Sequence, residues 1–259
     1  MANIHPTAIV DGKAELAESV VVGPYVVIQG KVQIGPETTI GPHCFLEGPS
    51  VIGSHNKIGA FVNIGAAPQH VLYRGEDTTL EIGNANQFRE FVTIHRGTVQ
   101  GGGKTVVGHF NLLMIGCHIA HDVLCGSGVI MANYAQIAGH CKIGDYAVFG
   151  GLAGLHQHAR VGRAAMVGAL SGVALDAPPF SMVIGERAKF VSLNKTGMKR
   201  LGFKEETVEA IKKAYQIIQS GDLLVDEALK KVEQELGQVA EVREIIDFYK
   251  TSERGVITR

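Results

Sequence analysis

Several features are absent from this sequence, and each absence removes a class of protein. There is no tryptophan, charged residues make up only 19% of the chain, and the formal net charge is −1. A nearly neutral chain has no overall field that would recruit nucleic acid or a membrane surface. No apolar run reaches the ~18 residues of a membrane-spanning helix, and the first residues, MANIHPTAIVDGKAEL, contain no apolar signal core. We therefore expect a cytoplasmic protein with no nucleic-acid partner and no membrane span.

Cysteine is also scarce, and its spacing is uninformative about metal or redox chemistry. None of the four cysteines forms a C-x-x-C pair, the usual spacing in zinc knuckles and redox motifs. They are Cys44, Cys117, Cys125 and Cys141. We expect free thiols in a reducing compartment.

The sequence does contain a regular period of six. Every sixth residue from Ile4 to Ile64 is aliphatic, and a second series of twelve apolar residues runs unbroken from Val107 to Val173. Helices repeat at 3.6 residues and strands at 2, so neither produces a strict six. A hexapeptide period is typical of a parallel β-helix. The alternative, chance alternation of Val and Ile in a β-sandwich, does not account for twelve consecutive matches.

Each hexad is predicted to form one side of a triangular, 18-residue coil. Its apolar residue points inward, and the next residue, often glycine, turns the corner because glycine is conformationally permissive. The period ends after Val173, and helical apolar spacing follows. We predict a β-helix over residues 1–185 and a small helical domain over 190–259. Interruptions near 66–81 and 97–105 are predicted to be loops that leave the coil and carry function.

The stretch GCHIAHDV (116–123) takes its meaning from this period. On a helix, His118 and His121 would share a face and suggest a metal site, but the period excludes a helix. Ile119 is the inward residue, so His121 is expected near a corner, outside the core. Residues 18 apart should lie one above another, which gives two polar columns: His121, Gly139 and Gln157; and Asp122, His140 and His158.

Three interpretations of these columns are open. Solvated surface histidines explain single residues, but less easily a cluster spread over three coils. A metal site would use Asp122 and the amide of Gln157, which are poor soft ligands. A catalytic site needs a base, a carboxylate that fixes its tautomer and a donor for an oxyanion. His121, Asp122 and the N–H of Gly139 supply these. The sequence therefore favours acyl transfer to a hydroxyl, with no metal.

Four motifs together resemble those of the acyl-ACP:UDP-N-acetylglucosamine O-acyltransferases, the first enzymes of lipid A biosynthesis. They are TIHRGTVQGGG (93–103), NLLMIGCHIAHD (111–122), IAGH (137–140) and GLHQ (154–157). The tail segment NKTGMKRLGF (194–203) is similar too, so the resemblance spans the chain. It implies a left-handed β-helix, against the usual handedness of parallel crossovers, and a homotrimer with active sites between subunits. It also implies 3-hydroxyacyl-acyl carrier protein as donor, a UDP-amino sugar as acceptor, and no cofactor.

The resemblance also assigns roles to individual residues. It makes His121 the general base for the sugar 3-hydroxyl, Asp122 its orienting carboxylate and Gly139 the oxyanion donor. Contacts with sugar, nucleotide, acyl chain or donor arm are implied for Gln69, His118, Asn133, His140, His156, Gln157, Asn194 and Arg200. Acyl-chain length is implied to depend on Ala169, with Met166 nearby.

The chain departs from the family pattern where the acceptor is bound. His70 stands where an acidic residue is common and Leu72 where a lysine is common, and Thr196 and Leu201 also differ. Leucine lacks the charge and the three donors of lysine. The acceptor therefore stays open between UDP-N-acetylglucosamine and its 3-amino analogue. The competing functions are another hexapeptide-repeat acyltransferase and a non-enzymatic or zinc-binding β-helix protein.

One basic segment is unbalanced by acidic residues. Six cationic side chains occur from residue 187 to 204 with no acidic one among them: Arg187, Lys189, Lys195, Lys199, Arg200 and Lys204. Such a segment suits an acidic carrier protein and a diphosphate, although a solvated linker would have a similar composition.

Overall fold

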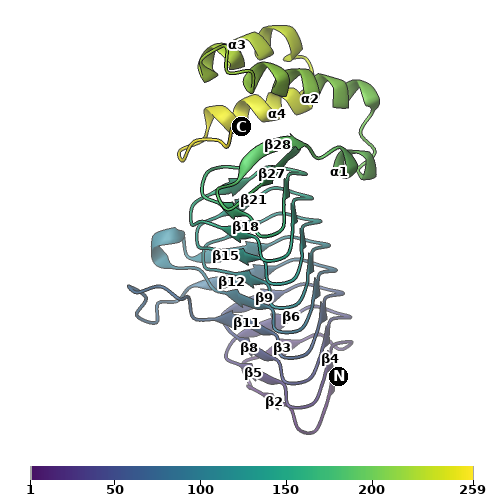
Figure 1. The fold of residues 1–259 in the computed structure, drawn as a ribbon. Coiled ribbons are helices and arrows are strands. Elements are labelled where there is room, and N and C mark those ends of the chain that lie inside the picture. Colours follow the sequence, from purple (N-terminus) through teal and green to yellow (C-terminus); the bar gives the residue numbers. More distant parts are fainter. Residues whose placement is uncertain (1, 259) are drawn as a thin grey trace.

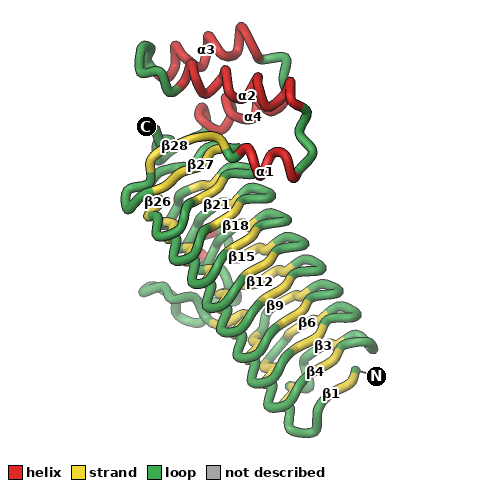
Figure 2. The backbone as a smooth tube through the Cα atoms, turned by 45° about the vertical axis from the view of Figure 1, so that its right-hand side comes forward, coloured by secondary structure: helices red, strands yellow, loops and turns green. Residues whose placement is uncertain are grey.

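The computed structural model describes residues 2–258, which form a prism of stacked coils capped by helices (Figure 1). Each coil contributes one short strand to each of three sheets, so the strands of a sheet are parallel and come from successive coils (Figure 2), except for the antiparallel last strand of the first sheet. The pairing register is 18 residues where no loop intervenes: His118 pairs with Gln136, and Gln136 with Gly154. This confirms the predicted coil length.

The strand bounds in the three sheets are as follows. The first sheet contains β1 (Asn3–Ile4), β4 (Val21–Val22), β7 (Thr39–Ile40), β10 (Lys57–Ile58), β13 (Gln87–Phe88), β16 (Leu112–Leu113), β19 (Ile130–Met131), β22 (Val148–Phe149), β25 (Met166–Val167), β27 (Ser181–Ile184) and β28 (Lys189–Leu193). The second contains β2 (Ile9–Val10), β5 (Val27–Gln29), β8 (Phe45–Glu47), β11 (Asn63–Ala66), β14 (Thr93–His95), β17 (His118–Ile119), β20 (Gln136–Ile137), β23 (Gly154–Leu155) and β26 (Gly172–Val173). The third contains β3 (Glu15–Leu16), β6 (Val32–Ile34), β9 (Ser50–Ile52), β12 (Thr79–Ile82), β15 (Lys104–Val107), β18 (Leu124–Cys125), β21 (Lys142–Ile143) and β24 (Arg160–Val161).

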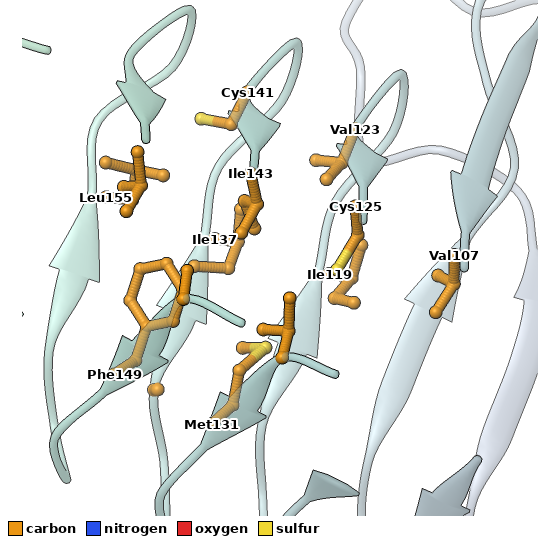
Figure 3. Packing of buried hydrophobic residues seen from close by; sticks show 14 of the residues in the cluster. Val107, Ile119, Val123, Cys125, Met131, Ile137, Cys141, Ile143, Phe149 and Leu155 are labelled. Atoms are coloured by element: carbon orange, nitrogen blue, oxygen red, sulfur yellow. The ribbon is translucent and has the colours of Figure 1, made fainter. Parts of the chain in front are cut away.

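The core is the column of inward-pointing apolar side chains. Ile119 and Ile137 from the second sheet and Met131 from the first are fully buried side by side inside the prism, as Figure 3 shows. Full burial of such a side chain stabilises the fold by about 1.5–3 kcal/mol. The hexad residue predicted to point inward therefore does so.

The predicted role of the glycines was wrong. The corner residue with left-handed backbone is the third after the inward one: Asp122 has a φ of 62° and His140 a φ of 63°. Gly23, directly after an inward residue, has no positive φ, and a Cβ there would lie 2.8 Å from the carbonyl oxygen of Ile40 on the next coil. Gly23 therefore has no room for a side chain, because the next coil approaches too closely.

Two loops leave the coil on the side that carries the polar columns. The first joins β11 to β12, and the second joins β14 to β15 through a 3-10 helix, η1 (Val99–Gly101). The buried guanidinium of Arg96 fixes the base of the first loop. Its Nη1 donates to the carbonyl of Gly65 at 2.6 Å and to Glu47 at 2.9 Å, and its Nη2 donates to the hydroxyl of Tyr73 at 3.3 Å.

The C-terminal part caps the prism. The hairpin of β27 and β28 extends the first sheet to Leu193, past the predicted end of the β-helix at 185. Four helices follow: α1 (Lys195–Arg200), α2 (Glu205–Ile218), α3 (Val225–Leu236) and α4 (Ala240–Lys250). None of the helices among residues 2–258 is long and apolar enough to cross a membrane.

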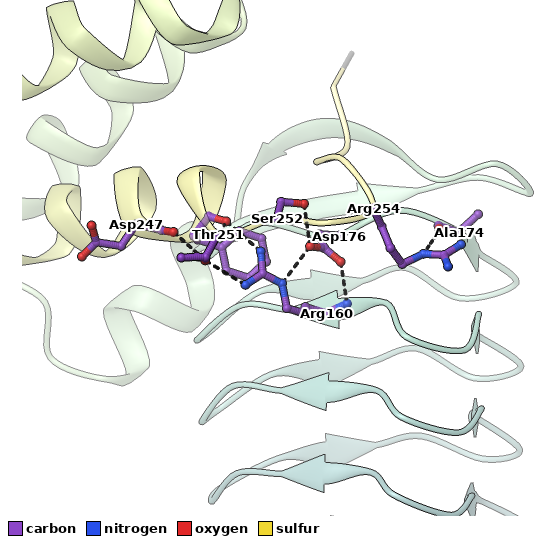
Figure 4. A network of polar contacts seen from close by, with 8 residues as sticks. Arg160, Ala174, Asp176, Asp247, Thr251, Ser252 and Arg254 are labelled. Carbon is purple, nitrogen blue, oxygen red and sulfur yellow. Dashed lines mark hydrogen bonds and ion pairs between the residues drawn. The ribbon is translucent and has the colours of Figure 1, made fainter. Parts of the chain in front are cut away.

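A buried carboxylate fastens the chain end to the prism (Figure 4). Asp176, 1% exposed, accepts hydrogen bonds from the backbone N–H and Nε of Arg160 at 2.8 and 2.7 Å, and from Oγ of Ser252 at 2.7 Å. The guanidinium of Arg160 also donates to the carbonyl of Phe248 at the end of α4. The last coil and the helical cap therefore share one polar network.

Candidate functional site

The central pair of the site is His121 and Asp122, at the corner that follows β17. Nδ1 of His121 lies 2.7 Å from Oδ2 of Asp122, so Nδ1–H donates to the carboxylate and Nε2 is left to accept a proton. His121 lies outside the apolar core but is only 7% exposed, because the ring of His70 from the first loop packs edge-on against it, 5.1 Å between centroids.

The second loop holds the carboxylate of Asp122. The backbone N–H and Oγ1 of Thr98 donate to its two oxygens at 2.7 and 2.6 Å, and the backbone N–H of Asp122 donates to Oγ1 of Thr105 at 2.8 Å. Burial acts to raise the pKa of Asp122, but the hydrogen bonds from His121 and Thr98 outweigh burial and lower it. The carboxylate is therefore ionised and fixed in orientation.

Gly139 lies directly against the ring of His121. A Cβ on Gly139 would be 2.5 Å from Cε1 of His121, so only glycine leaves room for the ring. The carbonyl of Gly139 accepts from the N–H of His158 at 3.0 Å. The N–H of Gly139 donates to no other group among the described residues, which leaves it free to stabilise an oxyanion beside His121.

These groups line a cavity of about 510 Å³ on the face of the second sheet. Six of the predicted site residues border it: Gln69, His118, His121, Gly139, His156 and Gln157. The first loop, two corners and the face of the second sheet thus meet around His121, although the lining residues are up to 88 positions apart in sequence.

Two further histidines, His140 and His158, continue from His121 on the other side of the corner that Asp122 occupies. His140 lies 5.0 Å from His121, ring to ring, and His158 stacks on His140 at 4.4 Å. Nδ1 of His140 is 3.6 Å from Oδ2 of Asp122, while burial lowers the pKa of His140. One ligand atom each from His121, Asp122 and His140 lies within 4.8 Å of the others. His121 from the first predicted column and His140 from the second therefore both approach the carboxylate of Asp122.

The sequence analysis missed His95. It is 7% exposed, its ring is 4.8 Å from that of His118, and its buried Nδ1 has no partner among the described residues. Burial lowers the pKa of His95 to about 4, so the ring is neutral. The 18-residue column failed here because the second loop shifts the register: Ile94 pairs with Ile119, 25 residues later.

Besides Asp122 and His140, five predicted residues do not line this cavity within one chain. Asn194 is buried and caps α1: its Oδ1 accepts from the N–H of Gly197, and its Nδ2 donates to the carbonyl of Ala164. The others are Asn133, Met166, Ala169 and Arg200. Arg200 is exposed on α1 beside Lys195 and Lys199, so part of the basic segment forms a cationic surface there.

A parallel β-helix of hexapeptide repeats with a histidine–carboxylate pair in a side cavity defines a class, the hexapeptide-repeat transferases. The family model of bacterial transferase hexapeptide repeats matches residues 13–48 and 31–66. A second model, Udp N-acetylglucosamine O-acyltransferase, Domain 2, matches residues 176–257. The first model matches the start of the β-helix, and the second matches the C-terminal part of the chain.

Individual relatives are more specific. The chain is 46% identical over 256 residues to the acyl-[acyl-carrier-protein]–UDP-N-acetylglucosamine O-acyltransferase of Thermodesulfovibrio yellowstonii, covering 99% of both chains. It is 49% identical over 257 residues to the protein of that name from Thiobacillus denitrificans, covering 99% of this chain and all of the relative. The crystal structure of UDP-N-acetylglucosamine O-acyltransferase from Moraxella catarrhalis superimposes with a TM-score of 0.95 at 40% identity, covering 98% and 99% of the two chains.

The chain belongs to the acyl-[acyl-carrier-protein]–UDP-N-acetylglucosamine O-acyltransferase family. The predicted family and the predicted fold class, a left-handed parallel β-helix with a small helical C-terminal part, are confirmed.

Proposed function

We propose that this protein transfers a 3-hydroxyacyl group from acyl carrier protein to the 3-position of UDP-N-acetylglucosamine, the first step of lipid A biosynthesis. The observation that carries the proposal is the His121–Asp122 pair, with the ring of His121 packed on Gly139 inside a cavity. The names of the relatives, which match over the full chain, support the same donor and acceptor.

The geometry supports general-base catalysis. Nε2 of His121 takes the proton of the sugar 3-hydroxyl as its oxygen attacks the thioester carbonyl, and Asp122 stabilises the imidazolium that forms. The N–H of Gly139 donates to the oxyanion of the tetrahedral intermediate. The intermediate collapses to the ester and expels the carrier thiolate, which takes the proton from His121. The proton balance closes without a cofactor.

We further propose that the enzyme is a homotrimer with its sites between subunits. Large apolar side chains line one edge of the prism, each three residues past an inward residue of the first sheet: Phe61 (49% exposed), Phe91 (55%), Tyr134 (51%), Leu152 (60%) and Leu170 (68%). A row of this size is typical of a protein interface. A neighbouring copy could also supply Arg200 or Asn133, which lie outside the cavity of their own chain.

The remaining substrate contacts are proposals of the same kind. Gln69, His118, His140, His156 and Gln157 would bind sugar or acyl chain, and the exposed cations of α1 suit an acidic carrier and a diphosphate. The cytoplasmic location stays a prediction; the four cysteines of the described chain are free, as is usual in reducing compartments.

A transfer assay with 3-hydroxyacyl-acyl carrier protein and UDP-N-acetylglucosamine tests the function. His121→Ala should lose about 10²–10⁴-fold in kcat and keep the oligomeric state in light scattering, while His55→Ala, at an exposed corner far along the prism, serves as control. The 3-amino acceptor is assayed in parallel because His70 and the exposed Leu72 differ from the family pattern. Wild-type activity in His121→Ala would refute the mechanism.

A further inference from the structure

We propose that His121, Asp122 and His140 form a binding site for a zinc-like divalent cation, and that occupation of this site switches the transferase off. The sequence analysis set a metal aside because Asp122 and the amide of Gln157 are poor soft ligands, but zinc also binds carboxylates, so Asp122 is an acceptable ligand beside two imidazoles. The structure instead brings His140 to the same carboxylate oxygen that holds His121. Two imidazoles and a carboxylate are ligands that zinc binds in proteins.

The distances suit a single cation. Zinc binds imidazole nitrogen and carboxylate oxygen at about 2.0–2.2 Å, so two ligand atoms on a tetrahedral ion are about 3.3 Å apart. Oδ2 of Asp122 is 2.7 Å from Nδ1 of His121 and 3.6 Å from Nδ1 of His140. The spacing to His140 is close to the required value, the spacing to His121 must open by about 0.6 Å, and the ligand atoms of all three residues lie within 4.8 Å of one another. Rotation of the two histidine side chains would bring these atoms to the ion.

The surroundings hold the ligands in place. Asp122 and His140 occupy stacked corners with the same left-handed backbone, so their side chains start from equivalent positions on successive coils. Thr98 donates to both oxygens of Asp122, and His158 stacks on the far face of His140 at 4.4 Å. Outer partners of this kind orient metal ligands and strengthen binding. The fourth position of the ion is left to water.

Cation binding removes the base by a change of tautomer. In the metal-free pair, Nδ1 of His121 carries the proton and Nε2 accepts. A cation between Nδ1 and Oδ2 displaces the Nδ1 proton, so a neutral ring then carries its proton on Nε2. That nitrogen can no longer accept the proton of the acceptor hydroxyl. If the ion binds Nε2 instead, the lone pair is occupied directly. Inhibition in either case rests on the proposed function of His121, whereas binding does not.

Isothermal calorimetry with Zn²⁺ alone tests the binding, because it needs no substrate. The wild-type protein should bind one ion per chain at this site. His140→Asn should weaken that binding by more than the roughly 10–100-fold that loss of an outer partner costs. His158→Asn, which removes the stacked neighbour but no ligand, is the matched control and should bind much more tightly than His140→Asn. Equal affinity in wild type and His140→Asn overturns the site.

Two further measurements complete the test. Wild-type protein titrated with Co²⁺ should show the intense visible bands of a four-coordinate ion, and their absence overturns the site even if the variants fold poorly. In the transfer assay, Zn²⁺ should inhibit His140→Asn at least tenfold less effectively than wild type, each relative to its own uninhibited rate. Zinc that binds at the three ligands without slowing transfer overturns the inhibitory role.

Discussion

The ring of His121 occupies the space that a side chain at Gly139 would need, with Cε1 2.5 Å from the position of a Cβ. Gly139→Ala must therefore displace the base, and a displacement of about 1 Å costs roughly 10²-fold in rate. We expect kcat to fall by at least that factor while the fold survives. Gly12→Ala, where a Cβ meets nothing within 4 Å, is the control. Equal kcat values for Gly139→Ala and Gly12→Ala would contradict the close contact between Gly139 and the ring of His121.

Thr98 is predicted to act as a positioning residue through Asp122. Thr98→Val keeps the backbone donor but removes the hydroxyl donor at 2.6 Å, and losing a hydrogen bond to a charged group costs about 1.5–3 kcal/mol. We expect a lower kcat with little change in KM, since the base is affected more than substrate contacts. Thr98→Ser should recover most of the activity. A KM effect alone would argue for a substrate contact instead.

Stability should depend on pH through His95. Its pKa is about 4 in the folded state, against 6.5 for the free side chain. Between these values the unfolded chain binds a proton that the folded chain does not, so the free energy of unfolding falls as the pH drops from 6.5 towards 4. His118 has its pKa lowered by burial and acts in the same direction. Urea unfolding at several pH values gives the free energy of unfolding as a function of pH, and this free energy should fall less steeply with decreasing pH in His95→Gln than in the wild type. An identical pH dependence in the two proteins would exclude this role.

The helical cap should loosen when Asp176 is changed. Asp176→Asn leaves the half-buried guanidinium of Arg160 without its carboxylate, and breaking such a buried pair costs about 3 kcal/mol. Glu244→Gln is the matched control, because its pair with Arg163 is about one third exposed and should contribute less than about 1 kcal/mol. Thermal melts and limited proteolysis of the C-terminal segment measure the difference. Equal melting temperatures would show that the network is not structurally important.

Chain-length preference should change at Ala169. The resemblance implies that glycine at the position of Ala169 permits a longer acyl chain, since an extra methyl in a filled groove costs about 1–3 kcal/mol. Ala169→Gly is therefore expected to shift the preferred donor to a longer acyl chain in a series of acyl-acyl carrier proteins. An optimum at the same length would remove Ala169 from the groove.

The sequence alone determined the repeating part of this protein. A strict period of six fixes which residue of each hexad is buried, and stacked coils repeat that environment every 18 residues, so the neighbours of Asp122 and Gly139 could be counted in advance. The family motifs then supplied the chemistry. The same counting failed at His95, where a loop shifts the register, and it misjudged the glycines because close approach between coils is not visible in one hexad.

Only the tertiary structure decided the contacts made by non-repeating segments. Thr98 reaches Asp122 across 24 residues, His70 covers the ring of His121, and Ser252 binds Asp176 across 76 residues. Such contacts depend on how each loop or tail folds back, and no periodicity specifies that path. These contacts also bury His121 and bring His140 close to the carboxylate of Asp122. A side chain at a corner can point to either side of the prism until neighbouring groups fix its direction.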